Sequence, residues 1–284
     1  MTVDLTAVVV TYSPGPYLDV LLDSLERACS VRYDVVLADN GSQDGVPERS
    51  AQDRTGVRLL RMGGNLGYGA AANLGVSTTA APWVLVLNPD LVLEPGSVDV
   101  LLDASRRWPR AGALGPAIRD PDGSPYPTGR RTPSLVVGSL HAALSGVWPD
   151  NPWSRAYLQV DSLETERTAG WLSGACLLLR RQAWESVGGF DPDYFMYFED
   201  VDLGERLARM GWLNIYVPSS KVVHIGGTTT SRQPVEMLRA HHESAARYVT
   251  ARYPRPVALA VRAGLRTRLA VLTRRGRSPE VPRE

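Results

Sequence analysis

The sequence predicts an α/β protein with a mostly parallel central sheet covered by helices on both faces. Short β-branched runs alternate with amphipathic stretches through the first half of the chain. This strand-helix-strand alternation is typical of parallel sheets. Each predicted strand is followed by a polar or glycine-rich segment, which is where ligands bind in such sheets. The chain has 284 residues and is long enough to bury a substantial core.

The first half of the chain contains four predicted strands and two predicted helices. The strands are expected over residues 7–11, 35–38, 57–62 and 83–87, and the helices over residues 17–28 and 66–78. The helix over residues 17–28 carries an apolar stripe of Leu18, Leu21, Leu22 and Leu25. Such a stripe indicates a helix that packs on one face of the sheet.

The second half begins with a proline-rich stretch over residues 120–153, which predicts a long irregular connection around the site. Regular elements are then expected in the order strand 171–179, helix 181–187, helix 198–210, strand 212–217 and helix 234–252. His224 falls in a predicted loop that continues through Gly226 and Gly227.

Composition excludes several classes of protein. The 31 basic and 30 acidic side chains give a formal charge of +1, which supplies no overall reason for nucleic-acid binding. Cys29 and Cys176 lie in apolar runs without metal-ligand spacing, so buried reduced thiols are expected. The first apolar run is too short for a signal peptide or a membrane span. We therefore expect a cytoplasmic protein, or one bound peripherally to the inner face of the cell membrane.

The C-terminal stretch from residue 252 carries nine arginines against two glutamates. Its apolar residues share one helical face, formed by Val257, Val261, Leu265, Leu269 and Leu272. A basic amphipathic helix of this kind binds anionic membrane surfaces. It is equally typical of a solvated helix that packs on its own domain, and the pattern leaves both interpretations open.

Two acidic motifs could carry chemistry. Asn88-Pro89-Asp90 follows the predicted strand 83–87, where a carboxylate can hold a divalent cation on a diphosphate, although the motif is also a common turn. The cluster Glu199-Asp200-Val201-Asp202 follows an aromatic run. Its acids can deprotonate a sugar hydroxyl or interact with a helix dipole, and the dipole accounts poorly for three of them. His224 becomes a metal ligand only if it folds back towards Asp90.

Seven motifs in this order resemble the inverting family 2 glycosyltransferases, which have the Rossmann-like GT-A fold. The resemblance covers about residues 3–230. It rests on residues 8–12, residues 39–45, Asn65 with Gly67 and Asn73, residues 88–90, residues 170–175, residues 189–191, and residues 198–203 with His224. Within the family, the Tyr-Phe-Glu-Asp-Val-Asp-Leu stretch is most similar to that of bacterial rhamnosyltransferases.

Among these, the sequence is most similar to the actinobacterial cell-wall linker enzymes. That resemblance implies transfer of L-rhamnose from dTDP-rhamnose to N-acetylglucosaminyl-diphosphoryl-polyprenol, with Mn²⁺ or Mg²⁺ as cofactor. The partners it implies are a nucleotide-sugar donor, a polyprenyl-diphosphate-linked acceptor and a cytosolic membrane surface that the basic tail contacts. A homodimer is also possible. A UDP-sugar donor for polysaccharide or O-antigen synthesis is the alternative.

The resemblance implies a role for residues on the donor side. The donor-binding set is Thr11, Tyr12, Asp39, Asn65, Gly67, Asn73, Asn88 and Asp90. Asp39 is expected to hydrogen-bond the pyrimidine ring. Asp90 is expected to ligate the metal ion, with His224 as a second ligand. Because Asn88 replaces the first acid of the usual Asp-x-Asp motif, the protein would supply only one carboxylate to the metal.

On the acceptor side, Asp200 is implied as the general base that deprotonates the acceptor hydroxyl. Glu199 and Asp202 are expected to position that base or the acceptor, and Trp171 and Gly174 to border the acceptor. Arg130 and Arg131, in the proline-rich stretch, are hypothesised to clamp the lipid diphosphate.

The expected organisation is a glycosyltransferase domain over residues 1–233, followed by C-terminal helices and the basic tail over residues 234–284. The nucleotide-binding half ends at about residue 118, and the acceptor-binding half covers residues 119–233. A sugar-phosphate nucleotidyltransferase is disfavoured because no glycine-rich activation loop follows the first strand. A non-catalytic binding protein is disfavoured because Asp39, Asp90 and Asp200 are all present.

Overall fold

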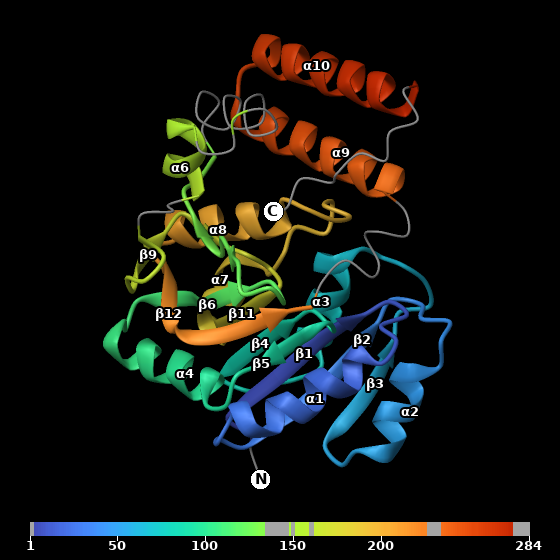
Figure 1. The fold of residues 1–284 in the computed structure, drawn as a ribbon, viewed down its shortest axis with the longest axis vertical. Helices are drawn as coiled ribbons and strands as arrows, with labels where there is room; N and C mark the ends of the chain where they lie inside the picture. Colours follow the sequence, from blue (N-terminus) through green and yellow to red (C-terminus); the bar gives the residue numbers. More distant parts are fainter. Residues whose placement is uncertain (1–2, 134–147, 149–150, 159–161, 226–233, 275–284) are drawn as a thin grey trace.

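The computed structural model describes residues 3–133, 148, 151–158, 162–225 and 234–274, and within them the chain forms one ten-stranded sheet (Figure 1). Its spatial order is β3 (Val57–Arg61), β2 (Tyr33–Asp39), β1 (Leu5–Thr11), β4 (Trp83–Leu87), β11 (Cys176–Arg180), β6 (Ala111–Arg119), β12 (Leu213–His224) and β5 (Leu91–Leu93). Two further short strands pair outside this order: β7 (Pro125–Tyr126) pairs with β6, and β9 (Arg167–Ala169) pairs with β12.

The strand directions confirm the predicted mostly parallel sheet. β1 pairs in parallel with β2 and β4, β2 pairs in parallel with β3, and β6 pairs in parallel with β12. β11 runs antiparallel to both of its neighbours, β4 and β6, and β5 runs antiparallel to β12. The carboxyl ends of the parallel strands therefore lie together along one side of the sheet, and the antiparallel β11 begins on that side.

Helices cover both faces of the sheet, as the sequence predicts. One face is covered by α1 (Tyr17–Ala28) and α4 (Ser97–Arg107). The other is covered by α3 (Tyr68–Ser77), α7 (Arg181–Val187) and α8 (Glu199–Arg209). Successive β1 side chains enter opposite cores because side chains alternate along a strand: Ala7 and Val9 face α1, and Val8 and Val10 face α3. α2 (Val46–Asp53) packs beside β3.

The strand β6 was not predicted from the sequence, although it is buried along nearly its whole length. Its sequence AGALGPAIR is rich in glycine, alanine and proline, which have low strand propensity. Small residues are needed there because a Cβ on Gly112 would lie 2.8 Å from the Trp212 side chain. The helices α2 and α4 and the short strand β5 were also not predicted.

Three predicted boundaries differ from the structure. The segment 171–179, predicted as one strand, contains β10 (Trp171–Leu172) and β11, separated by three residues that approach the site. The strand predicted over 212–217 continues to His224, so that histidine ends a strand and does not lie in a loop. Within the connection 120–153, β7 and β8 (Gly129–Arg130) are regular, and β8 pairs with β10 in a second small sheet.

The C-terminal part is helical, as expected. The helix α9 (Pro234–Arg252) lies above the start of α8, and α10 (Arg255–Arg274) packs on α9 (Figure 1). An aromatic cluster joins α8 to α9 through Tyr194, Phe198 and Tyr248, and α6 (Pro152–Leu158) adds Tyr157 to it. The described helices include none with the length and apolar character needed to cross a bilayer. Gly226, Gly227 and the end of the tail lie outside the described residues.

Candidate active site

The candidate site lies at the edge where the parallel strands end. Thr11 ends β1, Asp39 ends β2, Asn88 follows β4 and His224 ends β12. The antiparallel β11 begins at this edge because Cys176 pairs with Leu87. The backbone N–H of Asn88 donates to the carbonyl oxygen of Ala175 at 2.9 Å, which places the loop between β10 and β11 beside Asn88.

The ends of β1 and β2 are joined through Asp39, which is 3% exposed. Its Oδ1 accepts hydrogen bonds from Thr11 Oγ1 at 3.0 Å and from the Ser42 N–H at 3.2 Å. Neither bond uses Oδ2. Tyr12, the next residue after Thr11, is 39% exposed. The structure thus brings Thr11 and Asp39 together and leaves Tyr12 at the surface.

Asn40, which was assigned no separate role from the sequence, holds the glycine-rich loop after β3. Its Oδ1 accepts the Leu66 N–H at 2.8 Å, and its Nδ2 donates to the Gly67 carbonyl at 3.0 Å. Asn65 Oδ1 accepts the Gly67 N–H at 3.0 Å. Gly67 has φ +89°, and a Cβ there would lie 2.2 Å from the carbonyl oxygen of Phe195. Only glycine therefore allows this loop to meet the segment that precedes α8.

Asp90 and His224 come together, as the metal-ligand prediction required. His224 Nε2 lies 3.1 Å from Asp90 Oδ1, and both side chains are mostly buried. The Ile225 N–H donates to the Asp90 carbonyl at 2.9 Å, which fixes the end of β12 against the segment after β4. The described residues contain no cluster of three or more His, Cys, Asp or Glu able to hold a metal.

The Asp90–His224 pair fits a divalent cation on its donor chemistry. One carboxylate oxygen and one imidazole nitrogen suit Mn²⁺, and a carboxylate also suits Mg²⁺. Two protein ligands leave most coordination positions to phosphate oxygens and water, which is how Mg²⁺ is usually bound at nucleotide sites.

Asp200 lies in the first turn of α8 and is held by backbone N–H groups. Its Oδ2 accepts the Gly174 N–H at 2.8 Å, and its Oδ1 accepts the Val201 N–H at 2.8 Å. The phenol of Tyr68 donates to the Gly174 carbonyl at 2.6 Å, so one peptide segment binds both side chains. Tyr68 was missed by sequence reasoning, although it directly follows Gly67, a predicted site residue.

Glu199 and Asp200 form a buried acidic pair, each 6% exposed. Burial and then the charge of Asp200 raise the pKa of Glu199 to about 8. Burial also raises the pKa of Asp200, against the opposing effects of its N–H bonds and of Arg130. Glu199 Oε2 has no hydrogen-bond partner within the described structure. Since the Gly174 and Val201 N–H groups favour a carboxylate at Asp200, whereas Oε2 of Glu199 has no partner among the described residues, Glu199 is the better place for the proton.

The backbone before this pair is left-handed at two residues that are not glycine. Tyr197 has φ +69° and Phe198 has φ +65°. Such conformations are costly for aromatic residues and persist only where packing enforces them. Here Phe198 packs against Tyr248 of α9 at 5.3 Å between ring centroids. The aromatic contacts therefore help to set the direction in which α8 starts.

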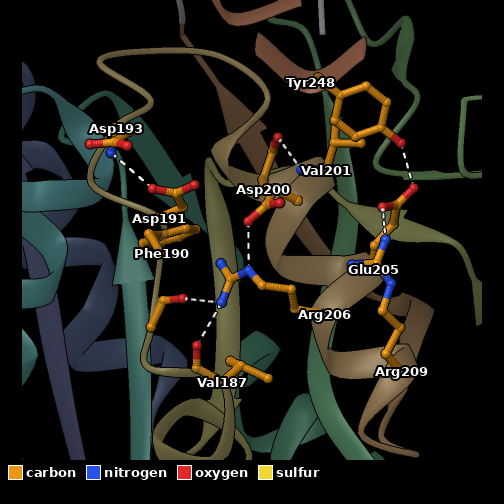
Figure 2. A network of polar contacts seen from close by, with 12 residues as sticks. Val187, Phe190, Asp191, Asp193, Asp200, Val201, Glu205, Arg206, Arg209 and Tyr248 are labelled. Carbon is orange, nitrogen blue, oxygen red and sulfur yellow. Dashed lines mark hydrogen bonds and ion pairs between the residues drawn. The ribbon is translucent and has the colours of Figure 1, made fainter. Parts of the chain in front are cut away.

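Asp202 was predicted to position the base or the acceptor, and the structure gives it different partners. Its Oδ2 accepts Arg206 Nε at 2.6 Å, and its Oδ1 accepts Arg252 Nη2 at 2.8 Å. Figure 2 shows Arg206 extending from α8 to the backbone of Val187. Both carboxylate oxygens of Asp202 therefore bind arginines. Arg252 links Asp202 to α9, and Arg206 links it to the end of α7.

Trp171 and Asn73 also have structural partners. Trp171 is 1% exposed and its indole donates to the Arg131 carbonyl, so its side chain has a structural partner, and its place beside the acceptor stays a prediction. Asn73 Nδ2 donates to the Phe190 carbonyl at 2.8 Å, and its Oδ1 accepts the Phe190 N–H at 2.9 Å. Asn73 thus braces α3 against the loop after α7.

Arg130 and Arg131, predicted together, have different surroundings. Arg131 is exposed, whereas Arg130 is 2% exposed. The Arg130 guanidinium carbon lies 4.9 Å from the Trp171 ring centre and 5.6 Å from that of Tyr126. The Tyr126 ring in turn meets the His224 ring edge-on, 6.1 Å between centroids. Tyr126, which sequence reasoning missed, therefore connects Arg130 to the Asp90–His224 pair.

Comparisons with known sequences bear on this geometry. The family described as "Glycosyl transferase family 2" matches residues 6–188, and "Glycosyl transferase family group 2" matches residues 155–263. An N-acetylglucosaminyl-diphospho-decaprenol L-rhamnosyltransferase of Mycobacterium tuberculosis is 53% identical over 255 residues, covering 86% of this chain and 83% of that protein. The rhamnosyltransferase WbbL of Escherichia coli K12 is 23% identical over 85% of this chain and 91% of its own length.

Comparison with solved structures supports the fold. A mannosyltransferase from Pyrobaculum calidifontis, solved with GDP-Man and Mn²⁺, superposes with a TM-score of 0.60. It is 18% identical, and the match covers 98% of this chain and 77% of that one.

Proposed function

The chain belongs to glycosyl transferase family 2, and from this premise we propose that it transfers L-rhamnose from dTDP-rhamnose to a polyprenyl-diphosphate-linked N-acetylglucosamine. The observation that carries the proposal is the 53% identity to the M. tuberculosis enzyme over 86% of the chain. The same family membership makes the chain a glycosyltransferase whichever sugar it uses.

In this proposal Asp200 is the general base. It removes the proton from the acceptor hydroxyl while that oxygen forms a bond to the anomeric carbon, and the bond from that carbon to the diphosphate breaks. Two backbone N–H groups support this role because they hold the carboxylate in one orientation. Glu199, as the protonated neighbour, leaves the negative charge on Asp200. One attacking step with no carboxylate nucleophile inverts the anomeric configuration.

The leaving diphosphate departs on the side of Asp90 and His224. A divalent cation, when bound there, neutralises the charge that develops on the leaving group. Asp90 and His224 would hold it. Thr11 and Tyr12 would border the nucleotide, with Oδ2 of Asp39 accepting the pyrimidine N–H, and Asn65, Gly67 and Asn88 would shape the pocket. Asn73 supports that pocket through its bonds to Phe190.

The acceptor would enter on the side of Gly174, with the exposed Arg131 placed to bind its diphosphate. The arginines of α10 would then face an anionic membrane that holds the polyprenyl chain. Arg262, Arg266 and Arg268 are exposed, which supports this contact, whereas Val257, Val261 and Leu265 are half-buried. We propose a peripheral position at the inner membrane face, with residues 1–233 as the catalytic domain and residues 234–284 as the contact.

The test is a transfer assay with purified full-length protein. dTDP-rhamnose, UDP-N-acetylglucosamine and UDP-galactose are each incubated with a short-chain polyprenyl-diphosphoryl-N-acetylglucosamine, with Mn²⁺ or with EDTA, and products are identified by mass spectrometry. The expected result is metal-dependent addition of one deoxyhexose from dTDP-rhamnose only. Transfer from a UDP-sugar instead would keep the family and overturn the donor. No transfer from any donor, together with no nucleotide-sugar binding, would favour a non-catalytic protein.

A further inference from the structure

The guanidinium of Arg130 is a buried cation, and no carboxylate among the described residues forms an ion pair with it. Its Nε donates to the Pro127 carbonyl at 2.7 Å, and its Nη2 is buried with no hydrogen-bond partner among the described residues. An arginine that is 2% exposed loses most of its hydration, which is costly unless other groups compensate. Stacking on Trp171 and Tyr126 recovers part of that cost. A negative charge nearby would offset more of it.

The packing of β8, β10 and α8 brings Arg130 into the field of Asp200. Arg130 pairs with Trp171 in the small sheet, and the Trp171 backbone packs against Gly204, one helical turn after Asp200. Gly174, two residues beyond β10, donates its N–H to Asp200. The positive charge of Arg130 lowers the pKa of Asp200, in opposition to burial. The segment from Trp171 to Gly174 thus contacts Arg130 at one end and Asp200 at the other.

Among the described residues, the other charged and titratable groups around Asp200 do not supply a positive charge. These neighbours are Glu199 on the same helix and Tyr68 on α3. The pKa of Tyr68 is also raised by the charges of Cys176 and Asp90. An ionised Glu199 would repel a charge on Asp200. Arg130 is therefore the cation identified as acting on Asp200 in the described part of the chain.

We propose that Arg130 is a positioning residue whose buried positive charge keeps Asp200 ionised and ready to accept a proton. This inference rests on the proposed function, in which Asp200 is the base, and deepens it. Arg130 reaches the reaction through Asp200. The role differs from binding of the acceptor diphosphate, which we leave to Arg131.

The first measurement does not depend on the identity of the sugar. Protein labelled with [4-¹³C]aspartate is titrated by NMR, and Asp200→Asn identifies the Asp200 signal. Because Glu199 and Asp200 titrate together, the lower of their two midpoints is followed. Arg130→Met is expected to raise that midpoint by about one pH unit, the lower range of the effect of a neighbouring opposite charge. Arg130→Lys should restore most of the shift, because it keeps the charge.

Arg180 offers a matched control. Its guanidinium also stacks on a ring, 4.6 Å from the centre of Trp83, and its Nε also donates to a carbonyl, that of Ala111 at 3.1 Å. It lies at the far end of β11 from Cys176. Arg180→Met is expected to leave the Asp200 midpoint unchanged. If Arg130→Met does not fold, Arg130→Gln removes the charge and keeps a donor for Pro127.

The second measurement is the pH profile of kcat/KM with the donor that the transfer assay identifies. The acid limb should move up by about one pH unit in Arg130→Met, so that the loss of activity is about tenfold greater at low pH than at high pH. An unmoved midpoint and acid limb in folded Arg130→Met would overturn the inference. A raised acceptor KM with no midpoint shift would also overturn it and assign Arg130 to the diphosphate clamp. Inactivity of the wild type would contradict the proposed function alone, since the NMR result still decides the role of Arg130.

Discussion

His224 Nε2 lies 3.1 Å from Oδ1 of Asp90, although 134 residues separate the two in the chain. The contact arises because β12 runs antiparallel to β5, with His224 paired to Leu91, the residue after Asp90. A bond from the Ile225 N–H to the Asp90 carbonyl completes this arrangement. The two side chains thus meet through strand register, which makes their geometry rigid and their joint role testable.

Asp90→Asn and His224→Gln should each weaken the binding of dTDP-rhamnose in the presence of Mn²⁺ by about tenfold or more, because the first removes the carboxylate charge and the second the imidazole nitrogen that we propose to bind the metal. Isothermal titration calorimetry of wild type and variants, with Mn²⁺ and with EDTA, measures this. The variants should approach the wild-type affinity in EDTA. Equal affinities of variants and wild type in Mn²⁺ would rule out this pair as the metal site.

Asp200→Asn should lower kcat by about 10²–10⁴-fold while the donor Kd stays unchanged, because the amide cannot accept the acceptor proton. The substitution keeps the size of the side chain and one oxygen for the Gly174 N–H. Steady-state kinetics and calorimetry on the same preparation separate the two quantities. A residual kcat within a few-fold of wild type would mean that another group accepts the proton.

Asp202→Asn should affect stability more than chemistry. The substitution removes the charge that Arg206 and Arg252 share, and a broken buried ion pair costs about 3 kcal/mol. Urea unfolding monitored by fluorescence gives the free energy of unfolding. Asp103→Asn is the matched control, since its pair with Arg106 is exposed, and it should cost less than about 1 kcal/mol. If Asp202→Asn were as stable as wild type but lost kcat as Asp200→Asn does, the result would instead support the predicted role of Asp202 in positioning the base or the acceptor.

Gly67→Ala should destabilise the protein by about 2–4 kcal/mol, from left-handed strain together with a backbone clash. A Cβ at Gly67 would lie 2.2 Å from the Phe195 carbonyl oxygen, which also accepts the Tyr68 N–H at 3.0 Å. Gly64→Ala in the same loop meets nothing within 4 Å and should cost much less. Thermal unfolding of both variants checks the difference, and similar costs would disprove the close approach of this loop to Phe195.

Stability should fall as pH rises from about 4.5 to about 8, owing to Glu199. Its pKa is raised from the ordinary value of 4.5 to about 8 in the folded protein, so the folded state binds more protons than the unfolded state across that window. The stabilisation by protonated Glu199 is complete below its pKa in the unfolded chain and is lost above its pKa in the folded protein. Glu199→Gln, which resembles the protonated acid, should flatten the decline by a few kcal/mol. Urea unfolding at pH 5, 6, 7, 8 and 9 measures it, and parallel curves for both proteins would contradict the shift.

The local elements follow from the sequence where its pattern is strong. The helix predicted over residues 17–28 matches α1, because its leucine stripe determines which face is buried. The helix predicted over residues 181–187 matches α7. The strand β6 could not be predicted in this way, because its residues have low strand propensity. Gly112 is small because the Trp212 side chain packs against it. Propensity describes one residue at a time, whereas this strand is specified by its neighbours.

The site divides in the same way. The order of its motifs is a property of the sequence, and it suffices to identify the family and to propose Asp90, His224 and Asp200. The partners of each side chain depend on packing. Asp202 and Asp200 are two residues apart on one helix, yet one faces two arginines and the other faces Gly174.

Arg130 and Arg131 are likewise adjacent in the sequence, and only the tertiary structure decides that one is buried and the other exposed. The physical reason is that Arg130 lies in β8, where pairing with β10 places its guanidinium against the Trp171 ring. The sequence by itself determined the fold class, the family and the candidate chemical groups. Tertiary structure decided which of those groups are desolvated, which are neutralised by a partner, and which remain for the reaction.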